Sequence, residues 1–289
     1  MADLDPPRRL GPEASVPRWA LGLMAAHRAL DRLHDQRVSA TLELLRSGLP
    51  ASARGPFTDA IFARQPTYSP GGARFSEALF DWELAALQHP AWPRSGRVLL
   101  GGAGGGRELS ALSALGYEVD AFEPSALADD LARVALASPT ACTALRGDYE
   151  ALVRALTEGD GPLRSLAPPK AYDAVALGWG SLSHLLDPSA HRALLRALRR
   201  AWPSAPVLLS VHRLPSEPSL PRAARVVRRV AAGLGWPGAE LPDAVGFQPF
   251  AGFIYRFGER ELEELAKGAG YVATIRTRPY LHGVLVPAG

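Results

Sequence analysis

Apolar and polar positions first follow a helical period in this chain. From about Pro17 to Ser47 the apolar residues recur three and four positions apart, which predicts two helices or one broken helix. After Pro and Gly breaks, the pattern predicts a short helix over Thr58–Ala63, a loop over Gln65–Gly72 and an amphipathic helix over Phe75–Gln88. The polar, Pro-rich residues before Pro17 predict a tail.

From Arg97 onward, short apolar runs typical of buried strands alternate with amphipathic segments. We expect strands at Val98–Leu100, Tyr117–Phe122, Cys142–Leu145, Ala171–Leu177, Pro206–Val211, Tyr271–Thr277 and Gly283–Val286. Helices are expected from Arg107, and over Ala126–Ala137, Tyr149–Leu156, Ser189–Trp202, Arg222–Leu234 and Glu259–Gly268. This alternation with short loops predicts an α/β fold built on a doubly wound, parallel sheet.

The pattern of predicted elements divides the chain into two regions. Residues 1–95 are expected to form a tail and a helical cap, and residues 96–289 the α/β domain. A Pro-, Arg- and Gly-rich stretch at about 214–249 interrupts the alternation after the fifth strand. We interpret it as a lid-like insertion over the carboxyl ends of the strands, where open α/β sheets bind their ligands.

Composition narrows the class of protein. With 289 residues, 47% of them hydrophobic, the chain can bury a large core, and no apolar run approaches the roughly 20 residues that span a bilayer. The single cysteine, Cys142, and the absence of an apolar leader predict a cytoplasmic protein with no metal site. Arginine clusters at His191–Arg200 and Arg222–Arg229 lack interleaved aromatic residues, so we interpret them as solvated helix faces and expect no nucleic-acid partner.

The residues that indicate a ligand-binding function are concentrated in Arg97–Ser125. A strand leads into the glycine-dense turn Gly101–Gly106, a helix follows, and the second strand ends on the carboxylate of Glu123. Such a unit binds the adenosine part of a cofactor.

The spacing of the glycines separates two cofactor classes. Dinucleotide folds expect G-x-G-x-x-G, whereas Gly102, Gly104 and Gly106 give G-x-G-x-G. With Glu123 about 20 residues on, residues 96–289 resemble the class I S-adenosylmethionine-dependent methyltransferases. The resemblance implies a Rossmann-like, seven-stranded, mostly parallel sheet and S-adenosylmethionine as the cofactor, with S-adenosylhomocysteine as the product. A nicotinamide-dependent oxidoreductase remains an alternative.

The resemblance also implies roles for single residues. The glycine turn would pass the methionine part of the cofactor, Glu123 would accept from the ribose hydroxyls, and Asp148 would meet the adenine amino group. Together the implied cofactor contacts are Gly102, Ala103, Gly104, Gly106, Glu123, Pro124, Asp148, Tyr149, Gly178 and Trp179. Asp148 could equally cap the helix that starts at Tyr149. The family often has an acidic residue where this chain has Leu100, and Glu83 or Glu108 could compensate.

The sequence indicates the residues that contact the methyl acceptor less clearly than those that contact the cofactor. His184 and His212 follow the fourth and fifth strands and are candidate general bases, although His184 could simply pack. Candidate substrate contacts are Tyr68, Trp82, Trp179, Arg213 and Tyr255. Tyr68 could instead anchor the core, and Arg213 could cap an element or form a surface ion pair.

The sequence therefore predicts methyl transfer from S-adenosylmethionine to an O, N or S atom of a small-molecule acceptor by in-line displacement. We expect a monomer or homodimer that does not associate with membranes. The alternatives are an RNA or protein methyltransferase and a non-catalytic S-adenosylmethionine-binding protein.

Overall fold

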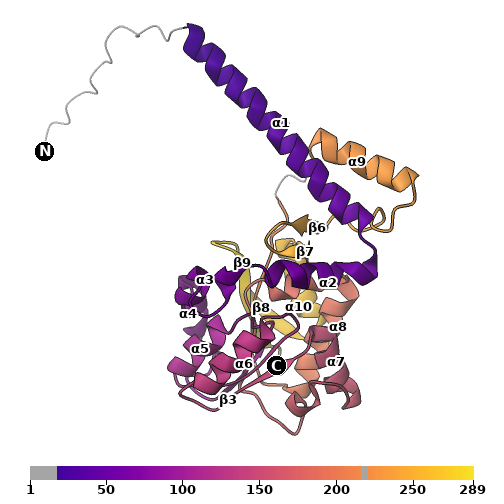
Figure 1. Ribbon diagram of the computed structural model, residues 1–289. Helices are drawn as coiled ribbons and strands as arrows, with labels where there is room; N and C mark the ends of the chain where they lie inside the picture. Colours follow the sequence, from indigo (N-terminus) through magenta and orange to yellow (C-terminus); the bar gives the residue numbers. More distant parts are fainter. Residues whose placement is uncertain (1–17, 216–219) are drawn as a thin grey trace, which may run out of the picture.

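The chain folds around one large, twisted sheet with helices on both faces (Figure 1). The computed structural model describes residues 18–215 and 220–289. The seven strands lie in the order β3-β2-β1-β4-β5-β9-β8. The first five pair in parallel, and β9 runs antiparallel to both β5 and β8. The strands are β1 (Arg97–Gly101), β2 (Glu118–Glu123), β3 (Cys142–Arg146), β4 (Ala174–Leu177), β5 (Val207–Val211), β8 (Tyr271–Arg276) and β9 (Leu281–Pro287).

The flanking helices cover opposite faces because successive strand residues point to opposite sides. On β1, Leu99 packs into one apolar core, while Val98 and Leu100 pack into the other. The Leu99 side is covered by α7 (Tyr149–Glu158), α8 (Pro188–Ala201) and α10 (Glu259–Gly268). The Leu100 side is covered by α4 (Asp81–Leu87), α5 (Arg107–Ala114) and α6 (Ala128–Ala137). The predicted doubly wound, Rossmann-like, seven-stranded and mostly parallel sheet is confirmed.

A second layer lies above the carboxyl ends of the strands and is built from two distant chain segments. The N-terminal segment supplies α1 (Arg18–Gly48), α2 (Ala51–Phe62) and the short helices η1 (Pro66–Tyr68) and α3 (Ala73–Ser76). The segment after β5 supplies α9 (Arg222–Gly233) and the antiparallel hairpin β6 (Val245–Gln248) and β7 (Gly252–Tyr255). In Figure 1, α9 lies along α1, and the hairpin lies beside α2.

Several sequence predictions were wrong in detail. The N-terminal segment forms one helix, α1, rather than a broken one, and α2 passes through Pro56. The helix expected over Phe75–Gln88 is two helices separated by Ala78, whose φ of 53° lies in the left-handed region. The new start at Phe80 is fixed by Glu83, whose carboxylate accepts the Phe80 N–H at 2.7 Å. The hairpin was not predicted, and the expected insertion boundary at residue 249 falls inside it.

Among the helices of residues 18–215 and 220–289, none combines the length and the apolar character that crossing a bilayer demands.

Candidate active site

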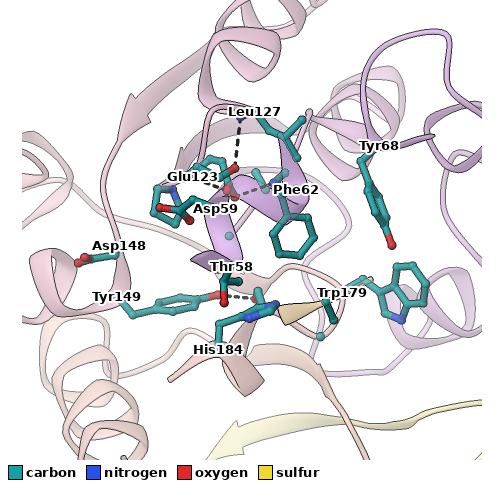
Figure 2. A pocket seen from close by; sticks show the side chains of 18 of the residues that line it. Thr58, Asp59, Phe62, Tyr68, Glu123, Leu127, Asp148, Tyr149, Trp179 and His184 are labelled. Carbon is teal, nitrogen blue, oxygen red and sulfur yellow. Dashed lines mark hydrogen bonds between the residues drawn. The ribbon is translucent and has the colours of Figure 1, made fainter. Parts of the chain in front are cut away.

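A cavity of about 490 Å³ opens where β1, β2, β4 and β5 end, between the sheet and the second layer. This volume lies within the roughly 300–1,000 Å³ of small-ligand sites. Its floor comes from the loops that follow the strands, and its roof from α2 and the hairpin. Figure 2 shows side chains from both layers pointing into the same space.

The glycine turn forms part of the floor. Gly102, Gly104 and Gly106 have φ values of 63°, 54° and 95°, a region in which a side chain is strained. Gly105 is needed for another reason: a Cβ there would lie 2.2 Å from the Tyr68 carbonyl oxygen. The backbone geometry of the turn therefore requires glycine at these four positions. The turn brings Gly102, Ala103 and Gly104 to the cavity surface.

Glu123 ends β2 inside the cavity and is only 7% exposed. Its Oε2 accepts the Gly104 N–H at 2.9 Å and its Oε1 accepts the Ser125 N–H at 3.1 Å. A carboxylate has about four acceptor positions, so two remain for a ligand. Burial raises the pKa of Glu123, and the carboxylate of Asp59 beside it raises that pKa further (Figure 2).

Asp148 and Tyr149 lie at the adjacent strand end. Asp148 caps α7 by accepting the Ala151 N–H at 2.7 Å, and the same residue lines the cavity, so the two interpretations of its role are compatible. The buried hydroxyl of Tyr149 donates to the Gly101 carbonyl oxygen at 3.0 Å and lies 2.5 Å from the Ser181 hydroxyl. Tyr149 thereby ties the glycine turn to the loop after β4.

A buried ionic cluster lies behind the glycine turn, near Leu100. The Arg107 guanidinium contacts both oxygens of Glu83, at 2.6 and 2.7 Å, and Glu108 Oε1 at 2.8 Å. Burial lowers the pKa of Arg107, but Glu108 and Glu83 more than offset this effect and raise it overall. Glu108 also accepts the Trp179 N–H at 3.1 Å and lines the cavity. Arg107 and Glu108 line the cavity, whereas Glu83 lies outside its lining.

The roof is made by α2, whose contact with the hairpin is specific. The Phe253 N–H donates to the Thr58 hydroxyl at 3.1 Å, and a Cβ on Gly252 would lie 2.4 Å from that oxygen. One turn of α2 further on, the Phe62 ring stacks edge-on against Tyr68, with the ring centroids 5.9 Å apart. The roof therefore presents aromatic rings to the cavity (Figure 2).

Both candidate bases line the cavity. His184 ends the short helix η3 (Ser181–His184), stacks edge-on against Phe62 with centroids 5.5 Å apart, and has Nδ1 3.2 Å from the Phe253 carbonyl oxygen. Because a carbonyl only accepts, Nδ1 carries the proton and Nε2 is the unprotonated nitrogen. Burial, with a smaller contribution from His212, lowers the pKa of His184 to about 4. Burial and Arg256 also lower the pKa of His212.

Of the other residues expected at the site, Tyr68, Pro124 and Trp179 line the cavity, but five do not. Gly106 caps α5, and Gly178 packs so tightly that a Cβ would lie 2.3 Å from the Gly102 carbonyl oxygen. Trp82 is buried against His282, Tyr255 donates its hydroxyl to Glu261, and Arg213 is exposed.

Sequence reasoning missed most of the roof. Thr58, Asp59, Phe62, Phe250 and Phe253 all line the cavity. The only signal in the sequence was their position in the two segments expected to enclose the acceptor.

No protein-family model matches this sequence, and no curated protein matches it significantly. Solved structures do match. The PH0226 protein from Pyrococcus horikoshii superimposes with a TM-score of 0.54 at 17% identity, over 78% of this chain and 97% of that one.

Two further structures match at lower TM-scores. CalS10, a SAM-bound amino pentose methyltransferase from Micromonospora echinaspora, matches with a TM-score of 0.47 at 14% identity, over 73% of this chain and 91% of that one. The CcbJ methyltransferase from Streptomyces caelestis matches with a TM-score of 0.44 at 17% identity, over 67% and 84%. At such identities the likeness concerns the fold alone.

Proposed function

We propose that this protein is an S-adenosylmethionine-dependent methyltransferase that acts on a small-molecule acceptor. The observation that carries the proposal is the position of Glu123, buried at the end of β2 beside the glycine turn with two acceptor positions unused. Those positions suit two vicinal ribose hydroxyls, as in the adenosine part of the cofactor. Asp148 lines the same cavity at the end of β3, with one carboxylate oxygen outside its helix cap.

The ionic cluster favours S-adenosylmethionine over a dinucleotide. In a dinucleotide fold the pyrophosphate sits at the start of the helix after the glycine turn. Here Glu108 stands in the first turn of α5 at the cavity wall, and the nearby Arg107 is fully engaged by Glu83 and Glu108. The Glu108 carboxylate at this position repels a pyrophosphate and attracts an ammonium group. Glu108 thus supplies the carboxylate that the family often places where this chain has Leu100.

The roof favours a flat acceptor of small size. Residues of α2 and the hairpin line the cavity on its outer side, and a roofed cavity of this volume suits a small molecule better than a polymer. The cavity lining includes the rings of Phe62, Tyr68 and Phe253, two histidines whose pKa values are lowered, and the arginines Arg54 and Arg74. Aromatic rings stack favourably on flat ligands.

When bound, the cofactor supplies an electrophilic methyl group, and the protein positions the acceptor and keeps water out. Such positioning contributes about 7–11 kcal/mol of barrier lowering. If the acceptor is a hydroxyl, Nε2 of His184 accepts its proton, because Nδ1 is already committed to Phe253. His212 stands on the other side of Gly180, with Nε2 3.2 Å from the position of a Cβ there, and is the second candidate base. The single cysteine, Cys142, supports a cytoplasmic location, because it cannot form a disulfide within the chain.

The test is methyl transfer from radiolabelled S-adenosylmethionine to a panel of phenols, heteroaromatic amines and thiols. The proposal predicts label in at least one small acceptor and formation of S-adenosylhomocysteine. Tight cofactor binding with no transfer to any class would favour a non-catalytic binding protein. Label in RNA or protein alone would contradict the small-molecule proposal.

A further inference from the structure

Arg54 is a buried arginine of α2 that lines the cavity, and it is only 9% exposed. Its Nε donates to the Leu49 carbonyl oxygen at 3.2 Å, and its Nη2 donates to the Pro237 carbonyl oxygen at 3.1 Å. A guanidinium has five N–H donors, so three of them, including both on Nη1, have no acceptor among the described residues. Arg54 therefore keeps donors for a ligand in the cavity.

Arg54 differs from the other buried arginines in having no carboxylate partner. Three arginines are buried in the described part of the chain. Arg46 pairs with Glu43 at 2.9 Å, and Arg107 pairs with Glu83 at 2.6 Å. For Arg54, no ion pair forms with any described residue, and burial lowers its pKa with no carboxylate to offset the effect. Because buried charges in proteins are almost always paired, the counter-charge of this guanidinium is missing from the described chain.

Asp59, the only carboxylate on α2, does not supply that charge. The five residues between the two positions turn through about 140° of the helix, so the two side chains leave α2 on different sides. The charged groups that act on the pKa of Asp59 are Arg146 and Asp148, and Arg54 is not among them. We therefore expect the counter-charge of Arg54 to arrive with a ligand.

Phe253 connects Arg54 to the candidate base. The guanidinium carbon of Arg54 lies 5.8 Å from the centre of the Phe253 ring. The backbone of Phe253 donates to Thr58 at 3.1 Å through its N–H and contacts His184 at 3.2 Å through its carbonyl oxygen. Arg54, Thr58 and Phe62 are spaced by four residues and share one face of α2. A ligand that lies against this face can contact the guanidinium and the imidazole at the same time.

We propose that Arg54 binds the carboxylate of an acidic, aromatic methyl acceptor. This assignment rests on the methyl transfer proposed above and narrows its substrate class. One guanidinium neutralises one unit of charge, which suits a carboxylate better than a phosphate group with its charge of about −1.5 to −2. Arg74 also lines the cavity, but it is already paired with Glu77 at 3.0 Å. Arginine is suited to this task because its planar fork matches the two oxygens of a carboxylate.

The cofactor is the second possible source of a carboxylate, since its methionine part carries one. That part is expected at the glycine turn on the cavity floor, whereas Arg54 belongs to the roof. Separate measurements of cofactor and acceptor binding distinguish the two sources.

The test is calorimetric titration of the protein, with and without S-adenosylhomocysteine, with aromatic acids and their neutral primary amides. The acids are hydroxybenzoate, hydroxycinnamate and indole carboxylate. We expect the wild type to bind at least one acid about tenfold or more tightly than its amide, because hydrogen bonds to charged groups are the strong ones. Arg54→Met should abolish this preference. A merely structural role of Arg54 would change the binding of acid and amide alike and leave their ratio as it is.

Arg54→Lys keeps the charge but not the planar fork, so its ratio should lie between those of the wild type and Arg54→Met. Urea unfolding shows whether each variant folds, and the lysine variant decides the question if the methionine variant does not fold. The matched control is Arg64→Met, just beyond the end of α2, because Arg64 is exposed and outside the cavity lining. It should bind acids and amides as the wild type does.

Three results would overturn the assignment of Arg54. The first is a wild type that binds no acid more tightly than its amide, and the second is a preference for the acid that persists in Arg54→Met. The third is weaker binding of S-adenosylhomocysteine to Arg54→Met with unchanged binding of the acids, which would assign Arg54 to the cofactor.

Radiolabelled S-adenosylmethionine separates this assignment from the methyltransferase function. An acid that binds through Arg54, with no label transferred to any acceptor, would contradict the proposed methyl transfer and retain the carboxylate site. Label in neutral acceptors alone, at rates that Arg54→Met does not change, would support methyl transfer and overturn the acidic acceptor.

Discussion

Glu123 is the residue on which we expect cofactor binding to depend most directly. Its carboxylate is held by two backbone N–H groups and keeps two acceptor positions toward the cavity. We expect Glu123→Gln to weaken S-adenosylhomocysteine binding by more than tenfold, because hydrogen bonds to a charged group contribute about 1.5–3 kcal/mol. Isothermal titration calorimetry measures the change.

The matched control for this variant is Glu118→Gln, at the opposite end of the same strand, β2. Its affinity for S-adenosylhomocysteine should equal that of the wild type. Equal affinities for all three proteins would show that Glu123 does not contact the cofactor.

His184 links the site to the pH dependence of stability. Its folded-state pKa is about 4, against about 6.5 in an unfolded chain, because it is buried and lies near His212. Between these values the unfolded state binds a proton that the folded state does not, so the free energy of unfolding falls as the pH drops from 6.5 to 4. His184→Asn should reduce this slope by up to about 1.4 kcal/mol per pH unit.

Urea unfolding at several pH values measures this slope. His34→Asn, on the exposed part of α1, is the control and should leave the slope as in the wild type. An unchanged slope in His184→Asn would mean that the imidazole of His184 is not buried as a neutral group.

Sequence motifs identified the cavity floor but not its roof. Glu123 and the glycine turn were found because strand, turn and helix follow one another directly in the chain. Thr58 and Phe253 meet only through tertiary packing of segments almost 200 residues apart, at a contact in which one hydroxyl accepts one backbone N–H. Trp82 shows the opposite error: an aromatic residue near the first strand was expected in the site but packs against His282.

At the scale of elements, the ionic cluster joins α4 to α5. Arg107 is 7% exposed and holds Glu83 and Glu108. Arg107→Met should destabilise the fold by about 3–5 kcal/mol, because it leaves two carboxylates buried without their cation. Arg133→Met, which removes the exposed arginine of a salt bridge to Asp130 on α6, should cost under about 1 kcal/mol.

Urea unfolding of both variants measures the two losses of folding stability. Equal, small losses of stability would contradict the burial of the cluster. Cofactor affinity should also change in Arg107→Met, since Glu108 loses the guanidinium that orients it at the cavity wall.

Helix α2 is expected to act on the acceptor and not on the cofactor. Its Phe62 ring packs against Tyr68 and His184 in the roof. Phe62→Ala should raise the KM for the acceptor roughly tenfold, in keeping with the loss of an aromatic contact and its buried area. The dissociation constant for S-adenosylhomocysteine should stay the same. Weaker binding of S-adenosylhomocysteine with an unchanged KM for the acceptor would mean that Phe62 contacts the cofactor and not the acceptor.

The elements of the sheet were predictable because each parallel strand is a short apolar run followed by an amphipathic helix. The second layer was harder to predict. The hairpin strands have four residues each and lie among Pro and Gly, so they resemble a loop. The single helix α1 depends on tertiary contacts: Arg46 donates to the Val245 and Leu241 carbonyl oxygens, and Arg228 binds Glu43.

At the scale of the whole molecule, the two chain segments that flank the sheet carry different tasks. Their inner parts, α2 and the β6–β7 hairpin, form the roof of the cavity, which we propose holds the acceptor. Their outer parts, α1 and α9, pack along each other. The glycine turn and Glu123 could be derived from one continuous stretch of sequence, whereas the roof of the cavity exists only once both segments have packed together.

The most direct test of the central claim is calorimetric titration of the wild-type protein with S-adenosylhomocysteine and, separately, with NAD. We predict that S-adenosylhomocysteine binds with one site per chain and more tightly than NAD, because Glu123 offers two acceptor positions and Glu108 opposes a pyrophosphate. Tighter binding of NAD, or no binding of S-adenosylhomocysteine, would contradict the account.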